Sequence, residues 1–321
     1  TTVELISKGF DVVIVDDLSN SKLNIFDKIK KITGKKPNLE IKDLKNKSEV
    51  KKLFSDYSFD GIIHFAAHKS VNESVNFPEK YYKNNIGSLE NLLENIDEKM
   101  HFIFSSSCTV YGQADKMPIK EDFPIKKSES PYGETKQICE SILKKFCDKN
   151  PNFRNITLRY FNPIGAHSSG LIGELPLGKP ENLVPFLTQT AIGIRDQLIV
   201  FGDDYNTPDG TCIRDYIHIE DLADVHVSCL ENSIQKKNKE NYEFYNVGTG
   251  KGLSVLELIN LFEKVNNVKV NYKIGKRRKG DVMVAFADVS KIIQNIGWVC
   301  KNSVEDALKS SWVWEKNLRD E

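Results

Sequence analysis

The sequence has no long hydrophobic run and no excess of either charge. No apolar stretch approaches the roughly 20 residues that a helix needs to cross a bilayer, so we expect no membrane partner. The 45 Lys and Arg residues balance the 45 Asp and Glu residues. A basic excess is typical of proteins that bind nucleic acid or anionic membrane surfaces, so we expect no nucleic-acid partner either.

Cysteine and histidine are sparse, at six residues each among 321. The cysteines are scattered without the CxxC spacing of zinc or redox sites, which indicates reduced thiols and a cytoplasmic protein. His64 and His68 lie four residues apart, but they flank the end of a predicted strand and do not share a helix face. We interpret them as core or loop histidines in preference to metal ligands, and we predict no metal site.

What the sequence does contain is a globular composition, with 40% hydrophobic and 28% charged residues. A chain of this length buries a substantial core. We therefore expect one large domain with a second lobe, or two closely joined domains.

Helices and short apolar strands alternate through the first half of the chain. We predict strands at 12–15, 38–42, 61–66, 102–105 and 156–160, and helices at 1–8, 22–33, 48–55, 78–96 and 131–148. The strands are continuous apolar runs, as burial on both faces requires. This order predicts an α/β fold with a Rossmann-like, doubly wound parallel sheet.

The character of the sequence changes after Pro163. Residues 162–185 are rich in Gly and Pro and predict a long functional loop. Beyond it we predict helices at 183–194 and 254–265 and strands at 198–201 and 244–247. We expect an NAD-binding domain at 1–165 and a smaller C-terminal α/β substrate lobe at 166–321, with some segments returning to the Rossmann sheet.

The beginning of the sequence does not follow the usual order of a dinucleotide-binding fold. Such a fold starts with a strand and a Gly-rich phosphate-binding turn, whereas this sequence opens inside a predicted helix. We expect that about 15 residues, carrying that strand and turn, precede Thr1.

Asp16, at the end of a predicted strand, is the first candidate cofactor residue. An acid in this position accepts hydrogen bonds from the adenosine ribose and repels a 2′-phosphate, which favours NAD over NADP. The alternative is that Asp16 only ends a strand. Asp43, after the next strand, and the small residues that follow Phe65 strengthen the cofactor interpretation, because open α/β sheets bind ligands at the carboxyl ends of their strands.

The segment SPYGETK (130–136) is the most informative about chemistry. Ser130 suits a helix N-cap and Pro131 the first helical position. Tyr132 and Lys136 then lie one turn apart on one face. A lysine ammonium, together with a positive nicotinamide ring, would lower the pKa of the tyrosine from about 10 and prepare it for proton transfer.

The YxxxK motif alone also fits an ordinary surface helix, so a second segment is needed to favour a catalytic site. The segment FSSSCTVYG (104–112) places a cluster of hydroxyl groups at the end of a predicted strand. Ser107 in that cluster could hydrogen-bond a reacting alcohol. The two segments in this order make a mere serine-rich loop the weaker interpretation.

These segments give the chain its resemblance to the extended short-chain dehydrogenase/reductase family, and specifically to its UDP-glucose 4-epimerase (UDP-galactose 4-epimerase) branch. The resemblance spans the whole sequence. Further matching segments are VDDLSNSK (15–22), HFAAHKSVNESV (64–75), YYKNNIGS (81–88), LRYFNPIGAH (158–167), ENLVPF (181–186), FGDDYNTPDGTCIRDYIHIEDLADVHV (201–227), YNVGTG (245–250) and RRKGDV (277–282).

The resemblance implies a set of site residues. The implied NAD contacts are Asp16, Asn20, Ser21, Asp43, Leu44, Phe65, Ala66, Lys69, Asn84, Tyr132, Lys136 and Tyr160. The implied catalytic residues are Tyr132, Lys136 and Ser107. The implied UDP-hexose contacts are Ser107, Tyr132, Phe161, Asn162, Asn182, Leu183, Phe201, Arg214, Arg278, Asp281 and Ala285.

Two of these contacts also have a direct physical basis. The guanidinium groups of Arg214 and Arg278 match a diphosphate, because each presents a fork of donors. Without the resemblance, Arg277 and Arg278 would be interpreted as part of a solvated charge run.

The implied reaction is a transient oxidation at carbon 4 of a UDP-hexose with tightly bound NAD, which interconverts UDP-glucose and UDP-galactose. Ala285 stands where a small residue in the family leaves room for an N-acetyl group, so we also expect activity on UDP-GlcNAc and UDP-GalNAc. The family further implies a homodimer formed through helices at about 78–96 and 131–148.

Two alternatives remain from other classes. A sibling UDP-sugar decarboxylase or dehydratase needs an extra acid or base beside the hydroxyl cluster, and residues 105–109 contain neither. A catalytically silent NAD-binding regulator would usually have lost the tyrosine or the lysine, and this chain retains both.

Overall fold

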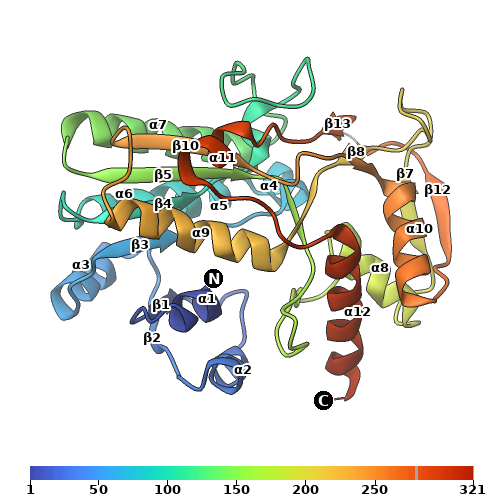
Figure 1. The fold of residues 1–321 in the computed structure, drawn as a ribbon, viewed down its shortest axis with the longest axis horizontal. Coiled ribbons are helices and arrows are strands. Elements are labelled where there is room, and N and C mark those ends of the chain that lie inside the picture. Colours follow the sequence, from blue (N-terminus) through green and yellow to red (C-terminus); the bar gives the residue numbers. More distant parts are fainter. Residues whose placement is uncertain (279–280, 321) are drawn as a thin grey trace.

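The computed structural model describes residues 1–278 and 281–320 and shows an α/β fold (Figure 1). Lys279 and Gly280, in the middle of the RRKGDV segment, lie outside the described residues. The α/β class and the parallel sheet that the sequence predicts are both confirmed.

The central sheet has four parallel strands in the order β10-β5-β4-β3. They are β3 (Gly61–His64), β4 (His101–Ser105), β5 (Arg154–Tyr160) and β10 (Tyr242–Val247). The middle strands are almost fully buried. β4 is largely apolar, as burial on both faces requires, whereas β5 also buries the polar side chains of Asn155, Thr157 and Arg159. β10 therefore lies beside β5 in the main sheet, although it comes from the C-terminal half of the chain.

Two further parallel strands, β1 (Val13–Asp16) and β2 (Asn38–Ile41), form a separate pair. β1 and β3 line opposite sides of one large cavity, and no strand of the described residues lies between them. Figure 1 shows this pair below β3, with α1 (Thr2–Ser7) and α2 (Asn24–Thr33) around it.

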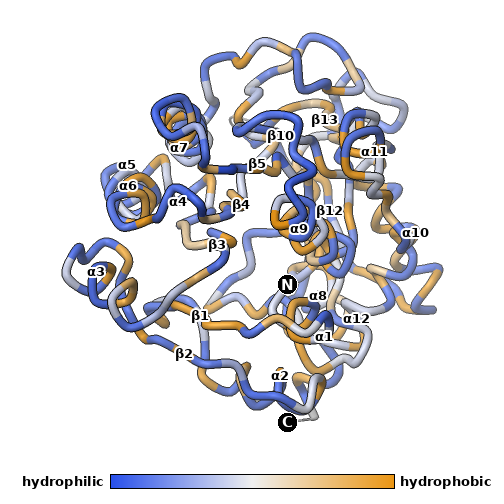
Figure 2. The backbone as a smooth tube through the Cα atoms, turned by 60° about the vertical axis from the view of Figure 1, so that its left-hand side comes forward, coloured by the Kyte–Doolittle hydropathy of each residue, from blue (hydrophilic) through white to orange (hydrophobic). Residues whose placement is uncertain are grey.

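Helices cover both faces of the central sheet (Figure 2). One face carries α4 (Val71–Asn76), α5 (Pro78–Tyr81), α6 (Gly87–Leu93) and α7 (Pro131–Lys149), with α3 (Lys47–Asp56) beside α6. The other face carries α9 (Ile219–Ile234) and α11 (Ser290–Ile296). Layers on both faces are the doubly wound arrangement that the alternating elements predict.

The helix predicted at 78–96 is interrupted. A π-helical turn, η1 (Tyr82–Ile86), separates α5 from α6. Inside it the buried Asn85 carboxamide accepts from the backbone N–H of His68 and donates to the His68 carbonyl oxygen and to Thr135 Oγ1. These contacts tie the turn to α7 and to the loop after β3, which explains why a regular helix does not continue here.

The C-terminal half forms a second packed unit. A parallel pair, β7 (Leu198–Phe201) and β12 (Tyr272–Gly275), packs with α8 (Leu183–Ala191), α10 (Val255–Asn266) and α12 (Val304–Asp320). Its core includes the fully buried side chains of Leu187, Leu258, Phe262 and Leu308. The sequence patterns did not predict α9 or α12.

Short strands connect the two units. β6 (Asn162–Ile164) pairs with β9 (Tyr216–His218), and β8 (Ile213–Arg214) lies between β11 (Leu253–Ser254) and β13 (Val284–Ala285). The 3-10 turn η2 (Cys108–Tyr111) follows β4. These elements bring residues 162–164, 213–218 and 284–285 to one side of the sheet.

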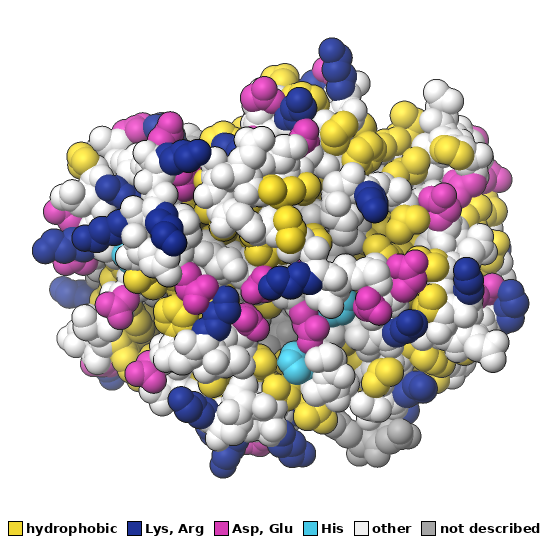
Figure 3. Space-filling view, in the orientation of Figure 1, with side chains coloured by type: hydrophobic (Ala, Val, Ile, Leu, Met, Phe, Trp, Pro, Cys, Tyr) yellow, Lys and Arg dark blue, Asp and Glu magenta, His cyan; other side chains and the backbone are white. Residues whose placement is uncertain are grey.

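Lys and Arg side chains are mixed with Asp and Glu side chains over the face shown in Figure 3. This distribution agrees with the equal numbers of acids and bases in the sequence. None of the helices in the described residues has the length and apolar character that a bilayer span requires.

Candidate functional site

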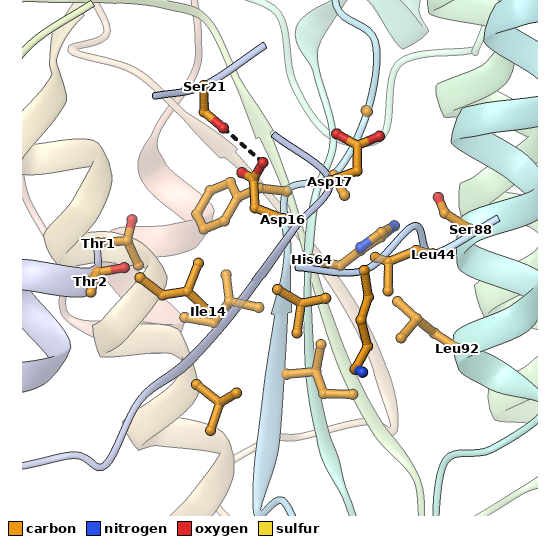
Figure 4. Close-up of a pocket in the computed structure, with 18 of the residues that line it drawn as sticks. Thr1, Thr2, Ile14, Asp16, Asp17, Ser21, Leu44, His64, Ser88 and Leu92 are labelled. Atoms are coloured by element: carbon orange, nitrogen blue, oxygen red, sulfur yellow. Dashed lines mark hydrogen bonds between the residues drawn. The ribbon is translucent and has the colours of Figure 1, made fainter. Parts of the chain in front are cut away.

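A cavity of about 2530 Å³ runs along β1 and β3 and includes the loops at the carboxyl ends of β1, β2 and β3 (Figure 4). Nine of the predicted cofactor residues line it, namely Asp16, Asn20, Ser21, Asp43, Leu44, Phe65, Ala66, Lys69 and Asn84. The predicted substrate residue Asn182 lines it as well. The structure thus gathers into one space residues that lie far apart in the sequence.

Asp16 ends β1 with its carboxylate directed toward the following loop (Figure 4). Its Oδ1 accepts from the backbone N–H of Leu18 and from Ser21 Oγ, each at 2.7 Å. Leu18 has a φ of 57°, so the chain turns tightly there and closes the loop around the acid. The carboxylate is held in a fixed position at the cavity wall.

A second polar group lies around Lys45, which the sequence analysis did not single out. Its Nζ is 3.1 Å from Asp43 and 3.8 Å from Asp17, and donates to Asn84 Oδ1 at 3.2 Å. Asp43 also accepts from the backbone N–H of Lys45 at 2.8 Å. The ends of β1 and β2 and the π-helical turn are therefore joined by charged contacts.

Across the cavity, the loop before α8 contacts the loop after β3. Lys69 Nζ lies 3.3 Å from Glu174 Oε1, which also accepts from Asn182 Nδ2 at 2.6 Å. Ser70 Oγ donates to the Glu181 carboxylate. Asn182 stands at the N-cap of α8 and Leu183 is its first residue.

Helix α7 begins as the sequence predicts. Ser130 Oγ accepts from the backbone N–H of Gly133 at 3.2 Å, and Pro131 occupies the first turn. Tyr132 and Lys136 lie on the inner face of this helix and are buried, at 7% and 4% exposure. They do not line the large cavity, and neither do Ser107, Tyr160 or Phe161.

Lys136 is oriented by the strand beside it. Its Nζ donates to the Ser105 carbonyl oxygen at 2.7 Å and lies 4.8 Å from the centre of the Phe104 ring. Burial lowers the pKa of Lys136 to about 8, against the opposing effect of Cys139 and Glu140. An amine with such a pKa changes charge close to neutral pH.

Burial also dominates at Tyr132 and raises the pKa of its phenol, while a hydrogen bond with the Ser107 side chain lowers it. The expectation of a lowered pKa is therefore not met by the protein's own groups. One reason is that the Lys136 ammonium group points at the Ser105 carbonyl oxygen. The other is that the sequence-based expectation included the positive charge of a nicotinamide ring, which would also lower the pKa of Tyr132.

Ser107 follows β4 and caps the turn η2, where its Oγ accepts from the backbone N–H of Thr109 at 3.2 Å. Tyr160 ends the neighbouring strand β5, and the Lys69 charge acts on its phenol. Phe65 packs on His226 with ring centres 4.7 Å apart, and Tyr160 on the same ring at 6.1 Å.

Two arginines of the C-terminal half converge on one carboxylate. Arg278 donates from Nε and from a terminal nitrogen to Asp281, the shorter distance being 2.6 Å. Arg214 lies 3.9 Å from the same carboxylate. The Arg278 guanidinium is also 5.5 Å from the ring centre of Phe201, which is 43% exposed at the end of β7.

The loop that carries Ser107 lies within electrostatic reach of Arg214, which acts on the thiol of Cys108, the neighbour of Ser107. Phe161 and Ala285 are buried in one cluster with Val110 and Tyr111. Asn162 starts β6, and its backbone N–H donates to the Asp215 carbonyl oxygen at 2.9 Å. Phe161 and Ala285 thus pack against the turn η2 that follows Ser107.

Sequence reasoning did not select Glu140, Arg159 or Asp215, which are all buried around the site. Glu140 had a detectable signal, since it follows Lys136 by four residues and repeats the spacing of Tyr132 and Lys136. No group of three or more His, Cys, Asp or Glu residues with the geometry of a metal site occurs within 1–278 and 281–320.

The comparisons with known proteins agree with this geometry. Residues 1–311 match the family described as GDP-mannose 4,6 dehydratase. The chain is 45% identical over 317 residues to the UDP-glucose 4-epimerase of Dictyostelium discoideum, covering 98% of this chain and 91% of that protein.

Two solved structures match this chain with a TM-score of 0.94 and 40% identity, covering 99% of it and 94% of each. One is the UDP-glucose 4-epimerase of Stenotrophomonas maltophila with bound NAD and formylated UDP-arabinopyranose. The other is the UDP-glucose 4-epimerase of Bifidobacterium longum in complex with NAD+ and UDP.

The lowered pKa of Lys136 predicts a change of stability with pH. The ordinary pKa is 10.5 and the folded one about 8, so the unfolded chain binds more protons between these values. Stability contributed by this group therefore rises with pH across that window. We expect wild type to gain about 3 kcal/mol in free energy of unfolding relative to Lys136→Met there.

Urea unfolding followed by circular dichroism at several pH values measures this difference. Lys145→Met replaces an exposed lysine of the same helix and serves as the control. A difference between wild type and Lys136→Met that stays constant across the window would contradict the prediction.

Proposed function

The chain belongs to the UDP-glucose 4-epimerase family, and we propose that it interconverts UDP-glucose and UDP-galactose by inverting carbon 4 with tightly bound NAD. The observation that carries the proposal is the burial of Tyr132 and Lys136 one turn apart on α7, where Tyr132 meets the Ser107 side chain and Lys136 meets the Ser105 carbonyl oxygen at the end of β4. The proposal assigns NAD binding to residues 1–165 and UDP-hexose binding mainly to 166–321. It includes a cytoplasmic location, which the six free cysteines support.

The part of the large cavity at the carboxyl ends of β1, β2 and β3 carries groups that suit NAD. Its walls carry the fixed carboxylate of Asp16 for a ribose, and the small residues after Phe65 allow a close approach of the cofactor. Lys69 lines this cavity, and its charge acts on Tyr160, whose phenol also interacts with the Ser105 side chain at the end of β4. The nicotinamide, when bound, supplies a reversible acceptor for the hydride of carbon 4.

The arginine pair fits the diphosphate of the nucleotide. Arg214 and Arg278 are already drawn together by Asp281, so their positive charges are arranged before a substrate arrives. Phe201, next to Arg278, offers an aromatic face for a base. Strong contacts to UDP leave the hexose itself weakly held, as a sugar that must present both faces requires.

In the proposed reaction Tyr132 removes the proton of the sugar 4-hydroxyl, and Ser107 hydrogen-bonds the same oxygen. Lys136 supplies positive charge that favours the phenolate. The planar 4-keto sugar turns while its nucleotide stays bound, and Tyr132 returns the proton when carbon 4 is reduced on the opposite face. Phe161 and Asn162 border the space in which the sugar turns.

Removal of the Tyr132 hydroxyl tests the activity. We expect wild type to convert UDP-galactose to UDP-glucose, and Tyr132→Phe to lower kcat by about 100-fold or more, because the proton acceptor is lost. Proton NMR of the products measures both. Tyr272→Phe, at an exposed tyrosine of β12, should retain wild-type activity. A decarboxylated or dehydrated product from wild type would indicate a sibling enzyme instead.

Ala285 makes a second prediction about the sugar. It is buried among Phe161, Tyr111 and Ile119, so a larger side chain there would fill space beside the substrate residues. We propose that wild type also accepts UDP-GlcNAc and UDP-GalNAc. Ala285→Tyr should abolish this activity and leave UDP-glucose turnover within about twofold, as measured by NMR on both substrate pairs.

Ala285→Ser is the matched control and should retain both activities. Equal loss of the two activities in Ala285→Tyr would refute the specificity role.

We further propose a homodimer formed through the helices at 78–96 and 131–148. Supporting it, Ile138 on α7 is only half-buried and belongs to none of the core clusters, and Phe77 before α5 is 61% exposed. Light scattering should give twice the chain mass of 36.5 kDa for wild type. Ile138→Glu should give the monomer mass, because a buried charge in the interface is costly.

Leu23→Glu changes an exposed leucine far from these helices in sequence and should remain a dimer. A wild-type mass equal to one chain would exclude the homodimer.

A further inference from the structure

Three residues of α7, spaced four apart, contact the last residue of β4 and the two residues that follow it. Tyr132 shares a hydrogen bond with the Ser107 side chain, Lys136 donates to the Ser105 carbonyl oxygen, and Glu140 accepts from Ser106 Oγ at 2.6 Å. The first two contacts belong to the proposed catalytic group. The third fixes the same loop to the same helix face but has no assigned role.

Glu140 is itself held by a buried arginine. Arg159 on β5 donates to both of its carboxylate oxygens, with a closest distance of 2.5 Å, and the two side chains are only 4% and 5% exposed. Arg159 lies between the rings of Tyr111 and Phe244, at 4.9 and 4.5 Å from their centres. The carboxylate therefore has no freedom to change its position.

The arrangement continues beyond the ion pair. Arg159 donates to Tyr111 Oη at 3.0 Å, and Tyr111 Oη donates to Asn246 Oδ1 at 2.7 Å. The Asn246 carboxamide then donates to the Ile119 carbonyl oxygen at 2.8 Å. Both ends of the segment that follows Ser107 are thus tied to β5 and β10.

We propose that Glu140 and Ser106 are positioning residues that hold the Ser107 loop in its place along α7, beside the Lys136 ammonium group. This inference rests on the proposed function, since it concerns the same site. Neither residue touches the substrate, and both act through Ser107 and Lys136.

The role of Ser106 follows from geometry. Ser107 must meet both Tyr132 and the reacting hydroxyl group, and its backbone is set by the two preceding residues. The backbone N–H of Ser106 donates to Leu158 and its hydroxyl to Glu140, so its main chain and side chain are held from opposite sides. Loss of the hydroxyl leaves the loop free to shift by a fraction of an ångström, which is enough to reduce turnover.

The role of Glu140 follows from charge. Lys136 is buried with Cys139 and Glu140 on its own helix and His64 on β3 within electrostatic reach. Arg159 and Tyr111 face Glu140 from β5 and η2, and Tyr242 faces it from β10. Cys139 and Glu140 both raise the pKa of Lys136, and Glu140 is the one of the two that places a carboxylate one helical turn from Lys136.

Ser106→Ala tests the geometric part in the purified protein with NAD. We expect kcat for UDP-galactose to fall by about tenfold with KM within about twofold, because substrate binding is untouched. Ser311→Ala removes another buried hydroxyl, on α12, and is the matched control. Equal kcat values for Ser106→Ala and Ser311→Ala would overturn the proposal for Ser106.

Glu140→Gln tests the electrostatic part. Its loss of charge should lower the pKa of Lys136, so the alkaline limb of the kcat profile should move to lower pH by about one unit. NMR titration of labelled lysine side chains measures the same shift without any turnover. An unchanged Lys136 titration would overturn the role of Glu140, and a variant that does not fold leaves Ser106→Ala to decide.

These experiments distinguish a failure of the proposed function from a failure of the positioning role. A wild-type protein that does not epimerise UDP-galactose refutes the proposed function, and the lysine titration still tests Glu140. An active wild type with unaffected variants refutes the positioning role alone.

Discussion

The ammonium group of Lys136 lies 2.7 Å from the Ser105 carbonyl oxygen, in the interior of the protein and one helical turn from Tyr132. A buried charge costs free energy unless it is compensated, so the hydrogen bond to Ser105 constrains how α7 and β4 are placed relative to each other. It depends on α7 starting where Ser130 caps it and on β4 ending at Ser105. The position of the phenol relative to Ser107 then follows from helix geometry.

Much of this site could be predicted from the sequence because local rules determine it. Ser130 and Pro131 are typical of a helix start and predict where α7 begins. The YxxxK spacing places Tyr132 and Lys136 on one face of any helix, independent of its surroundings. The apolar runs of β3, β4 and β5 predicted a parallel sheet, and the structure confirms it. The resemblance to UDP-glucose 4-epimerases is confirmed by the 45% identity to the Dictyostelium enzyme. The individual site residues remain predictions.

Other features depend on tertiary contacts that no local pattern contains. The π-helical turn at Tyr82–Ile86 exists because the Asn85 carboxamide has partners in the loop after β3 and on α7. Whether the pKa of Tyr132 is raised or lowered depends on how deeply the ring is buried, and residue spacing gives no information about burial. Glu140 and Arg159 are nineteen positions apart, and only the packing of α7 on β5 makes them an ion pair.

The carboxylate of Asp215 has a mechanical consequence. It accepts from the backbone N–H groups of Thr249, Gly250 and Ala287 and from the Thr249 hydroxyl, at 2.6 to 3.1 Å. A side chain at Gly248 would collide with it, so the loop fits only because glycine stands there. These bonds join the segment carrying Arg214 to the end of the central sheet as one rigid block. The proposed diphosphate residue Arg214 is therefore held in place by backbone hydrogen bonds of its own segment before any ligand binds.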